Sequence, residues 1–188
     1  KHFDNNLGIW KSLVAADPAN ATAQRGLAVT WDKVGGVQRN QHAYGPARES
    51  FTEALRIKER LATADPGSTR AQTDLANALQ RVGDAELDLD HPREARACFV
   101  RLLELGEKLA ASDTVDPHLQ VLLATGLHRM GHLEQTIQQP QLALPQLTRP
   151  LAILRQLEAA GKLPLDHKRE IAKIETSIAE CQALVNPR

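Results

Sequence analysis

Residues 71–102 read AQTDLANALQRVGDAELDLDHPREARACFVRL, and this stretch decides the fold. Its apolar residues recur at steps of three and four, at Leu75, Leu79 and Val82 and again at Ala95, Phe99 and Leu102. Such steps place the apolar side chains on one face of an α-helix. Asp90-His91-Pro92 interrupts the pattern, and proline fits the first turn of a helix better than its interior. The stretch therefore predicts two helices joined by a short turn.

The same pattern returns every 48 residues. Apolar positions in four copies are Leu27, Leu75, Leu123 and Ile171; Ala28, Ala76, Ala124 and Ala172; Val34, Val82, Met130 and Ile178; Leu7, Leu55, Leu103 and Leu151; and Leu13, Leu61, Leu109 and Leu157. Small and large residues recur in three copies at Gly35, Gly83 and Gly131, at Ala47, Ala95 and Ala143, and at Phe51, Phe99 and Leu147. We therefore predict an all-α protein, a right-handed α-solenoid of antiparallel helix pairs.

Proline-containing turns separate the predicted helices. Those between repeats are Asp17-Pro18, Asp65-Pro66 and Asp116-Pro117, and those inside repeats are Tyr44-Gly45-Pro46, Asp90-His91-Pro92 and Gln139-Pro140. We expect helices near residues 20–39, 44–63, 68–89, 92–112, 117–138, 141–160 and 166–185. The chain would be one domain, with a half-repeat at 1–17, repeats at 18–65, 66–115 and 116–164, and a capping helix at 165–188. Pro145 and Pro150 predict a kink or a late start in the helix at 141–160.

Composition narrows the function classes. Lys plus Arg and Asp plus Glu number 23 each, so no excess positive charge favours nucleic acid or anionic lipid. The apolar runs are far shorter than the roughly 20 residues that cross a bilayer. Cys98 and Cys181 both follow helical patterns, where a buried free thiol is the usual outcome. We expect neither nucleic-acid nor membrane binding, and a cytoplasmic location.

The register positions resemble the tetratricopeptide repeat family. The family signature combines a large residue, an aliphatic residue followed by Gly, an Ala, and a second large residue. The first full copy carries it at Trp31, Val34-Gly35, Ala47, Phe51 and Ala54. The second carries it at Leu79, Val82-Gly83, Ala95, Phe99 and Leu102, and the third at Leu127, Met130-Gly131, Ala143 and Leu147. The resemblance covers nearly the whole chain and implies a protein-interaction role.

The 48-residue period is longer than the family's usual repeat of about 34. Long-period arrays of this kind are similar to those of bacterial multidomain proteins, where they often follow a Ser/Thr kinase or a caspase-like domain. The resemblance therefore implies a scaffold or a regulatory region. It leaves open a second role as the sensor region of such an enzyme, and a third as a sensor of peptides or small ligands.

Few residues predict chemistry. His128 and His132 lie four apart on one helix, a spacing that can hold zinc, but Arg129 stands where a zinc protease places its acid. No Gly-Lys-Ser/Thr run follows the glycines, and neither cysteine has a histidine within one turn in sequence. We therefore predict no metal, no cofactor and no catalytic residue in this chain.

A protein or peptide partner would bind the polar faces of the first helices of the repeats, because these line the concave side of such a superhelix. The candidate residues of this groove are Asp32, Asn77, Gln80, Arg81, Asp84, His128, Arg129, His132 and Lys173. A second candidate surface is the N-terminal end, where Leu7, Ile9, Trp10 and Leu13 would expose apolar area without a preceding helix. Contact through that end, including end-to-end self-association, is the alternative binding mode.

Overall fold

The computed structural model describes residues 2–186. Its helices are α1 (His2–Ala16), α2 (Ala21–Asn40), α3 (Tyr44–Ala64), α4 (Thr69–Asp88), α5 (Pro92–Ser112), α6 (Pro117–Thr136), α7 (Pro140–Ala159) and α8 (Lys168–Val185), with a short 3-10 helix, η1, at Leu165–His167. No strand occurs among these described residues. The predicted all-α architecture of stacked helix pairs is confirmed, and the predicted helices differ from the observed ones by only a few residues at their ends.

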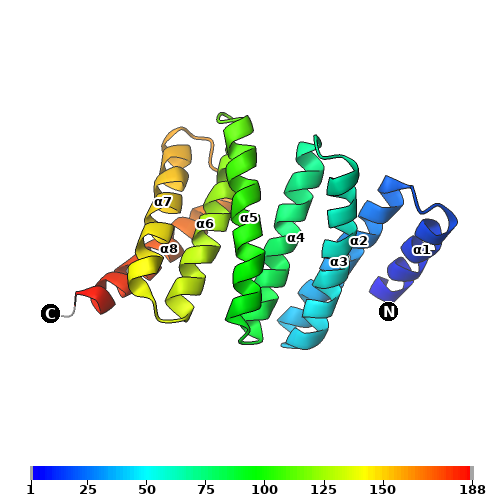
Figure 1. Ribbon diagram of the computed structural model, residues 1–188, viewed down its shortest axis with the longest axis horizontal. Coiled ribbons are helices and arrows are strands. Elements are labelled where there is room, and N and C mark those ends of the chain that lie inside the picture. Colours follow the sequence, from blue (N-terminus) through cyan, green and yellow to red (C-terminus); the bar gives the residue numbers. More distant parts are fainter. Residues whose placement is uncertain (1, 187–188) are drawn as a thin grey trace. The chain divides into compact units, whose positions relative to one another are not determined.

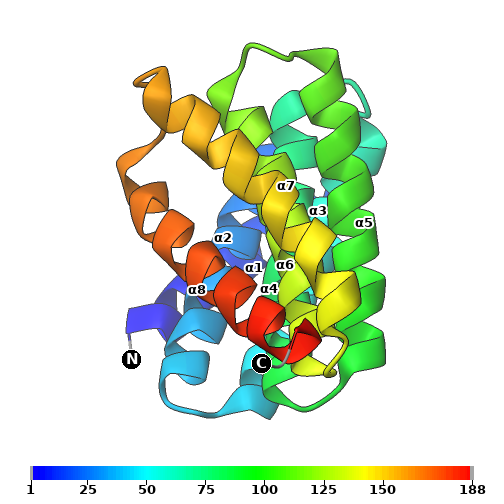
Figure 2. The same cartoon turned by 90° about the vertical axis from the view of Figure 1, so that its left-hand side faces the viewer.

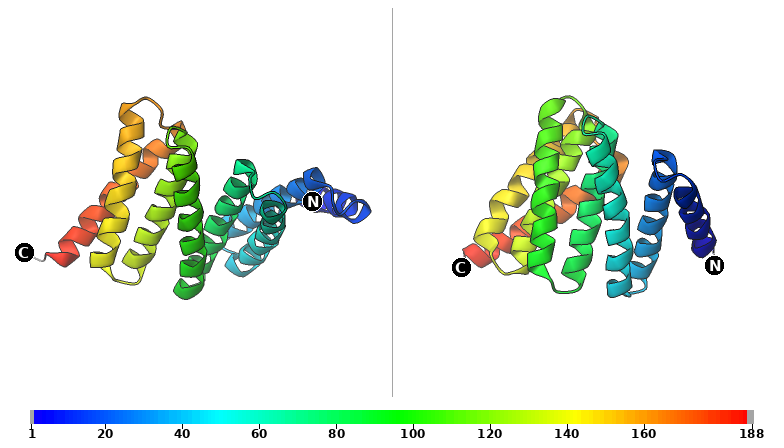
Figure 3. Two further views of the ribbon diagram at one scale, coloured as in Figure 1. Left: turned by 45° about the horizontal axis from the view of Figure 1, so that its top comes forward. Right: turned by 45° about the vertical axis from the view of Figure 1, so that its right-hand side comes forward.

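The chain divides into two compact units, residues 1–95 and 96–188. In the first unit α1 packs on α2, α2 on α3 and α3 on α4, with successive helices roughly antiparallel (Figure 1). Both views of Figure 3 place α1 beside α2. In the second unit α6 packs on α7 and α7 on α8, and Figure 2 looks onto this last pair. Helices that follow one another in these parts of the sequence are therefore neighbours in space, as stacked repeats require.

The first helix of each full repeat starts at a capping residue, and these residues are 48 apart. Asn20 and Ser68 accept hydrogen bonds from the backbone N–H three residues on, and Asp116 accepts one from His118 N. An accepting side chain at this position satisfies one of the free N–H groups of the first turn. Asp17-Pro18 and Asp65-Pro66 therefore precede the caps, whereas Asp116-Pro117 is itself the cap and first residue of α6.

The turns between first and second helices also repeat every 48 residues. His42, Asp90 and Gln138 have φ of 58°, 59° and 60°, the left-handed conformation that usually favours glycine. In each turn this residue donates its N–H three residues back, and the next residue donates its N–H five residues back. This is the Schellman arrangement, which satisfies the last carbonyls of the helix. The period thus sets local backbone geometry as well as packing.

Close approach between paired helices explains the recurring glycines. A Cβ on Gly35 would lie 2.7 Å from ring atoms of Phe51, and one on Gly131 would lie 2.7 Å from side-chain atoms of Leu147. The two contacts occupy the same register in the two units. The recurring alanines at 47, 95 and 143 are each 0% exposed. Small residues let the helices approach and the large ones fill the space between them.

Close contacts also occur at the junctions that precede these pairs. In the first unit Trp10 of α1 lies against Gly26, where a Cβ would be 2.7 Å from the indole ring. In the second unit Gly106 of α5, at the register position of Trp10, faces the backbone of α6, because a Cβ on it would lie 3.1 Å from Leu123 Cα. A large side chain fills this position in the first unit, and a glycine leaves room for the neighbouring backbone in the second.

The prolines of α7 do not delay its start. The helix begins at Pro140 and runs through Pro145 and Pro150 to Ala159, so the predicted late start is wrong. Proline lacks an N–H and frees one carbonyl in the preceding turn. Pro150 is buried, so packing against neighbouring residues helps to hold the helix together.

Candidate functional site

The predicted groove residues of the first unit lie on α2 and α4. Asn77 and Arg81 are exposed, and Gln80 is half-buried. Asp32 and Asp84 have side chains only 13% and 14% exposed. The structure therefore leaves Asn77 and Arg81 accessible from this set, while the two carboxylates lie close to other helices.

Four ion pairs join α2 to α4, and one of them is the contact of Arg39 Nη1 with Asp84 Oδ2 at 4.0 Å. The other three are Arg25 with Asp74, Asp32 with Arg81, and Arg39 with Asp88, each pair being 49 residues apart in sequence. The separations are 3.5 Å for Arg25 Nε to Asp74 Oδ2, 3.9 Å for Arg81 Nε to Asp32 Oδ1, and 3.1 Å for Arg39 Nη2 to Asp88 Oδ1. Members on one helix are seven residues apart, close to two turns, so they share a face. We call this set the ion-pair ladder.

Asp32 also pairs with a residue of α3. Lys58 of α3 is 5% exposed, and its Nζ donates a hydrogen bond to Asp32 Oδ2 at 2.6 Å. Asp32 Oδ1 is buried and accepts no hydrogen bond within the described chain. A buried ammonium needs such a partner, because an unpaired buried charge is strongly destabilising. Asp32 is therefore held by the fold through Lys58.

The predicted groove residues of the second unit lie on α6 and α8. His128 is 5% exposed, and its Nδ1 lies 2.7 Å from Glu170 Oε1. This hydrogen bond, opposed by burial and helped by the charges of Arg129 and Lys173, lowers the pKa of Glu170 to about 2. Lys173 is 70% exposed with Glu170 Oε2 at 3.7 Å, His132 is exposed and Arg129 is half-buried. His128 is thus part of the α6–α8 contact.

Each unit also contains an Arg–Glu pair whose members are 38 positions apart in sequence. In the second unit Arg96 binds Glu134 through both guanidinium ends, at 2.5 and 3.0 Å, and this contact raises the pKa of Arg96. In the first unit Arg48 Nη1 is 4.0 Å from Glu86 Oε1, and His91 Nδ1 lies 2.8 Å from Glu86 Oε2. Glu86 and Glu134 are 8% and 3% exposed. These groups are structural contacts that sequence reasoning did not single out.

The four apolar residues predicted to be exposed at the N-terminal end differ in how far they are buried. Leu7 and Trp10 are half-buried and pack with Leu27 and Ala28 of α2. Ile9 and Leu13 are 58% and 47% exposed, and they line a shallow hollow on α1. The apolar area of this end is therefore offered by Ile9 and Leu13.

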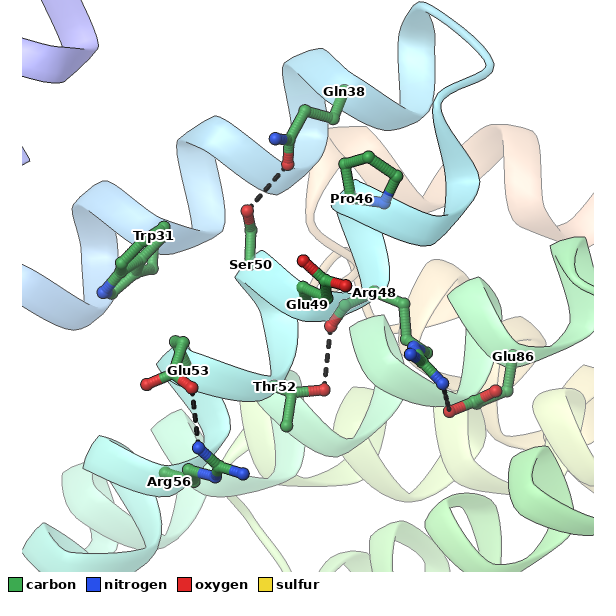
Figure 4. A pocket seen from close by; sticks show the side chains of 10 residues that line it. All are labelled: Trp31, Gln38, Pro46, Arg48, Glu49, Ser50, Thr52, Glu53, Arg56 and Glu86. Carbon is green, nitrogen blue, oxygen red and sulfur yellow. Dashed lines mark hydrogen bonds and ion pairs between the residues drawn. The ribbon is translucent and has the colours of Figure 1, made fainter.

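A hollow of about 620 Å³ lies over α3 (Figure 4). Its lining includes Trp31, Arg48, Ser50, Glu53 and Glu86. Ser50 Oγ donates a hydrogen bond to Gln38 Oε1 at 2.7 Å, and Glu53 Oε1 accepts one from Arg56 at 2.7 Å. The polar groups of this hollow thus bind one another, and its charges are of both signs.

A second hollow, of about 480 Å³, is lined from α1, α2 and α4. We call it the basic hollow, because its charged lining residues are Arg25, Lys33 and Arg70; Trp10 and Val29 supply apolar surface. Sequence reasoning missed these three cations. The available signal was the 48-residue register, in which Lys33 corresponds to the groove candidates Arg81 and Arg129. Arg25 and Arg70 had no such signal, since they meet only when α2 and α4 are side by side.

No group of three or more potential metal-ligating side chains occurs among the described residues. Cys98 and Cys181 are free thiols, and burial raises the pKa of Cys181. Over the same part of the chain, no helix combines the length and apolar character needed to span a bilayer.

Comparison with known proteins finds neither a family model nor a curated protein that matches the sequence.

Proposed function

We propose that this chain is a protein-interaction module built of tetratricopeptide-like repeats, acting as a scaffold or regulatory region. The observation that carries the proposal is that α2 and α4 are joined by ion pairs and also present exposed polar side chains. The ion-pair ladder joins the two helices, and Lys58 of α3 holds Asp32 of α2. Asn77 stays exposed, and Arg81, itself a member of the ladder, is 49% exposed. A rigid surface that presents ready donors binds without first losing much conformational freedom.

The proposal is tested by capturing a partner on the immobilised chain from a lysate of the cells that produce it, and then measuring its affinity by titration calorimetry. The groove variant is Asn77→Ala with Arg81→Ala. The matched control is Thr63→Ala with Arg60→Ala on α3, which removes the same kinds of group from exposed positions. We expect the wild type and the control to bind equally and the groove variant to bind at least ten-fold more weakly. Equal binding by all three would refute a groove on α2 and α4.

A further inference from the structure

The basic hollow differs in charge from the other hollows described in the first unit. The hollow over α3 contains Glu49, Glu53 and Glu86 beside its arginines, and the hollow on α1 has no charged lining residue. The basic hollow has Arg25, Lys33 and Arg70 and no carboxylate in its lining. Arg25 is paired with Asp74 outside this lining, so Lys33 and Arg70 supply the net positive charge of the hollow and create a local positive potential in a chain of zero net charge.

Two of these cations have no partner among the side chains that the structure describes, which are those of residues 5–165 and 167–186. Lys33 and Arg70 are exposed, and neither makes an ion pair or side-chain hydrogen bond with these residues. Arg25 is held near Asp74 at 3.5 Å, but its buried Nε has no hydrogen-bond partner in the same range. The hollow therefore has donors that the fold does not satisfy.

The floor of the basic hollow is apolar and fixed. Trp10 lies against Gly26, where no side chain competes for the space, and belongs to the cluster with Leu27. Val29 is 43% exposed beside it. A ligand that matches this site needs an anionic group for the cations and an apolar group for Trp10 and Val29. Its volume of about 480 Å³ suits a few side chains.

We propose that the basic hollow docks an acidic peptide segment of a partner protein, with a carboxylate at Lys33 and Arg70 and a neighbouring apolar side chain on Trp10 and Val29. This inference rests on the proposed protein-interaction function and names the chemistry of the partner. A nucleic acid fits less well, because the three cations lie in one hollow of about 480 Å³ in a chain of zero net charge, whereas a polyanion is bound by many cations along its length. A short acidic segment needs only the hollow.

The test is fluorescence anisotropy of the whole chain with a labelled peptide in which glutamates alternate with leucines. Two further probes are the same peptide with glutamines for glutamates and a labelled single-stranded oligonucleotide. The cation variant is Lys33→Met with Arg70→Met. Its matched control, Arg60→Met with Arg93→Met, removes two exposed cations of the same unit that also have no partner in the described chain.

We expect the cation variant to weaken binding of the glutamate peptide by about ten-fold, since one exposed ion pair is worth up to about five-fold. The control should bind like the wild type. Binding should also weaken as salt is raised, because exposed charges are screened. A second variant, Val29→Asp, places a carboxylate in the hollow and should abolish binding. Val37→Asp, at a similarly exposed position of α2, should not.

Several outcomes would overturn the inference. The first is equal binding of the glutamate peptide by the cation variant and its control, and the second is binding of the glutamine peptide as tightly as the glutamate peptide. The third is tighter binding of the oligonucleotide than of the glutamate peptide, with the same dependence on Lys33 and Arg70. The fourth is no binding of the glutamate peptide to the wild type. Each leaves the proposed function standing, because that function is tested separately through Asn77 and Arg81. Loss of partner capture only in the Asn77 and Arg81 variant would support the module while relocating its site.

Discussion

In residues 1–95, α2 is joined to α4 by arginine–aspartate pairs, whereas in residues 96–188 α6 is joined to α8 by His128 and Gln135. His128 stands where the first unit has Asp32, and Glu170 stands where it has Asp74. Gln135 Nε2 donates a hydrogen bond to Glu180 Oε2 at 2.6 Å, and these two correspond to Arg39 and Asp84. The positions of contact between first helices are therefore shared by the two units.

The chemistry at those positions differs because the two units carry different residues around them. Two acids at the positions of Asp32 and Asp74 are balanced in the first unit by Arg25 and Arg81. The second unit has Val121 and Ser177 at the positions of these arginines, and a histidine in place of one acid removes the need for them. Like charges that are unbalanced at close range would destabilise the contact. The repeat thus fixes where helices meet and leaves the kind of interaction free to vary.

The largest expected effect separates the two Arg–Glu pairs. Arg96→Met removes the bidentate partner of Glu134, which is 3% exposed, so we expect a loss of about 3 kcal/mol in the free energy of unfolding. Arg48→Met should cost about 1 kcal/mol or less, because the arginine is 4.0 Å from Glu86 and His91 remains in contact with it. Urea unfolding followed by circular dichroism measures both.

The double variant Arg96→Met with Glu134→Met is the control, since it leaves no buried charge and should recover much of the lost stability. Tryptophan fluorescence adds a local readout, because Trp10 and Trp31 both lie in the first unit. Equal losses for Arg48→Met and Arg96→Met would contradict the distinction between the two pairs.

A smaller effect is the loss of stability that we expect in acid from the protonation of Glu170 in the second unit. The pKa of Glu170 is lowered from its ordinary 4.5 to about 2, so the unfolded chain binds this proton first as pH falls. The stabilisation is therefore fully present above about pH 4.5 and is lost progressively as pH falls toward 2. With the side chain 26% exposed and partly screened, we expect about 1–2 kcal/mol.

The comparison is between the wild type and Glu170→Gln in urea unfolding at pH 6 and near pH 2.5. The variant should be less stable at pH 6, and the two proteins should approach each other in acid. A constant difference between them at both pH values would show that the ionisation of Glu170 does not stabilise the α6–α8 contact.

The smallest expected effect is the change in stability when glycine replaces a residue of positive φ in two turns that share the same backbone conformation. Gln138→Gly should raise stability by about 0.5–1 kcal/mol, because glycine adopts φ of 60° without the crowding that a Cβ meets there. His42→Gly should gain less, since it removes the contact of His42 Nδ1 with the Tyr44 hydroxyl at 2.8 Å. Urea midpoints compare the two variants with the wild type. A loss of stability in Gln138→Gly would mean that its side chain contributes a favourable contact.

The sequence predicts the helical frame well because the frame depends on local properties. The helix expected at 92–112 is observed as Pro92–Ser112. Most of the recurring apolar positions are buried or half-buried, whereas Leu13 and Ala172 are exposed. Capping residues and prolines act within a turn or two of their own position. The late start predicted for α7 failed because Pro145 can be accommodated inside a helix when neighbouring contacts hold it.

The candidate site is less predictable from the sequence. Asn77 and Arg81 were chosen from their place on a helix face, and both are exposed, but the same reasoning could not show that His128 is buried against Glu170. A face opposite the apolar stripe is not always a solvent face, because a neighbouring repeat also covers part of it. Burial there depends on how closely two helices approach.

Sequence periodicity alone determined that this protein is a stack of helix pairs, because the spacing of apolar, small and turn residues is a property of the chain itself. Tertiary structure decided which charges neutralise one another. Arg25 pairs with Asp74 and Asp32 with Arg81 only once α2 and α4 are packed as neighbours, while Lys33 and Arg70 meet no acid among the side chains that the structure describes. The three arginine–aspartate pairs share a 49-residue separation that is visible in the sequence, but whether such residues come within a few ångströms depends on how the two helices pack.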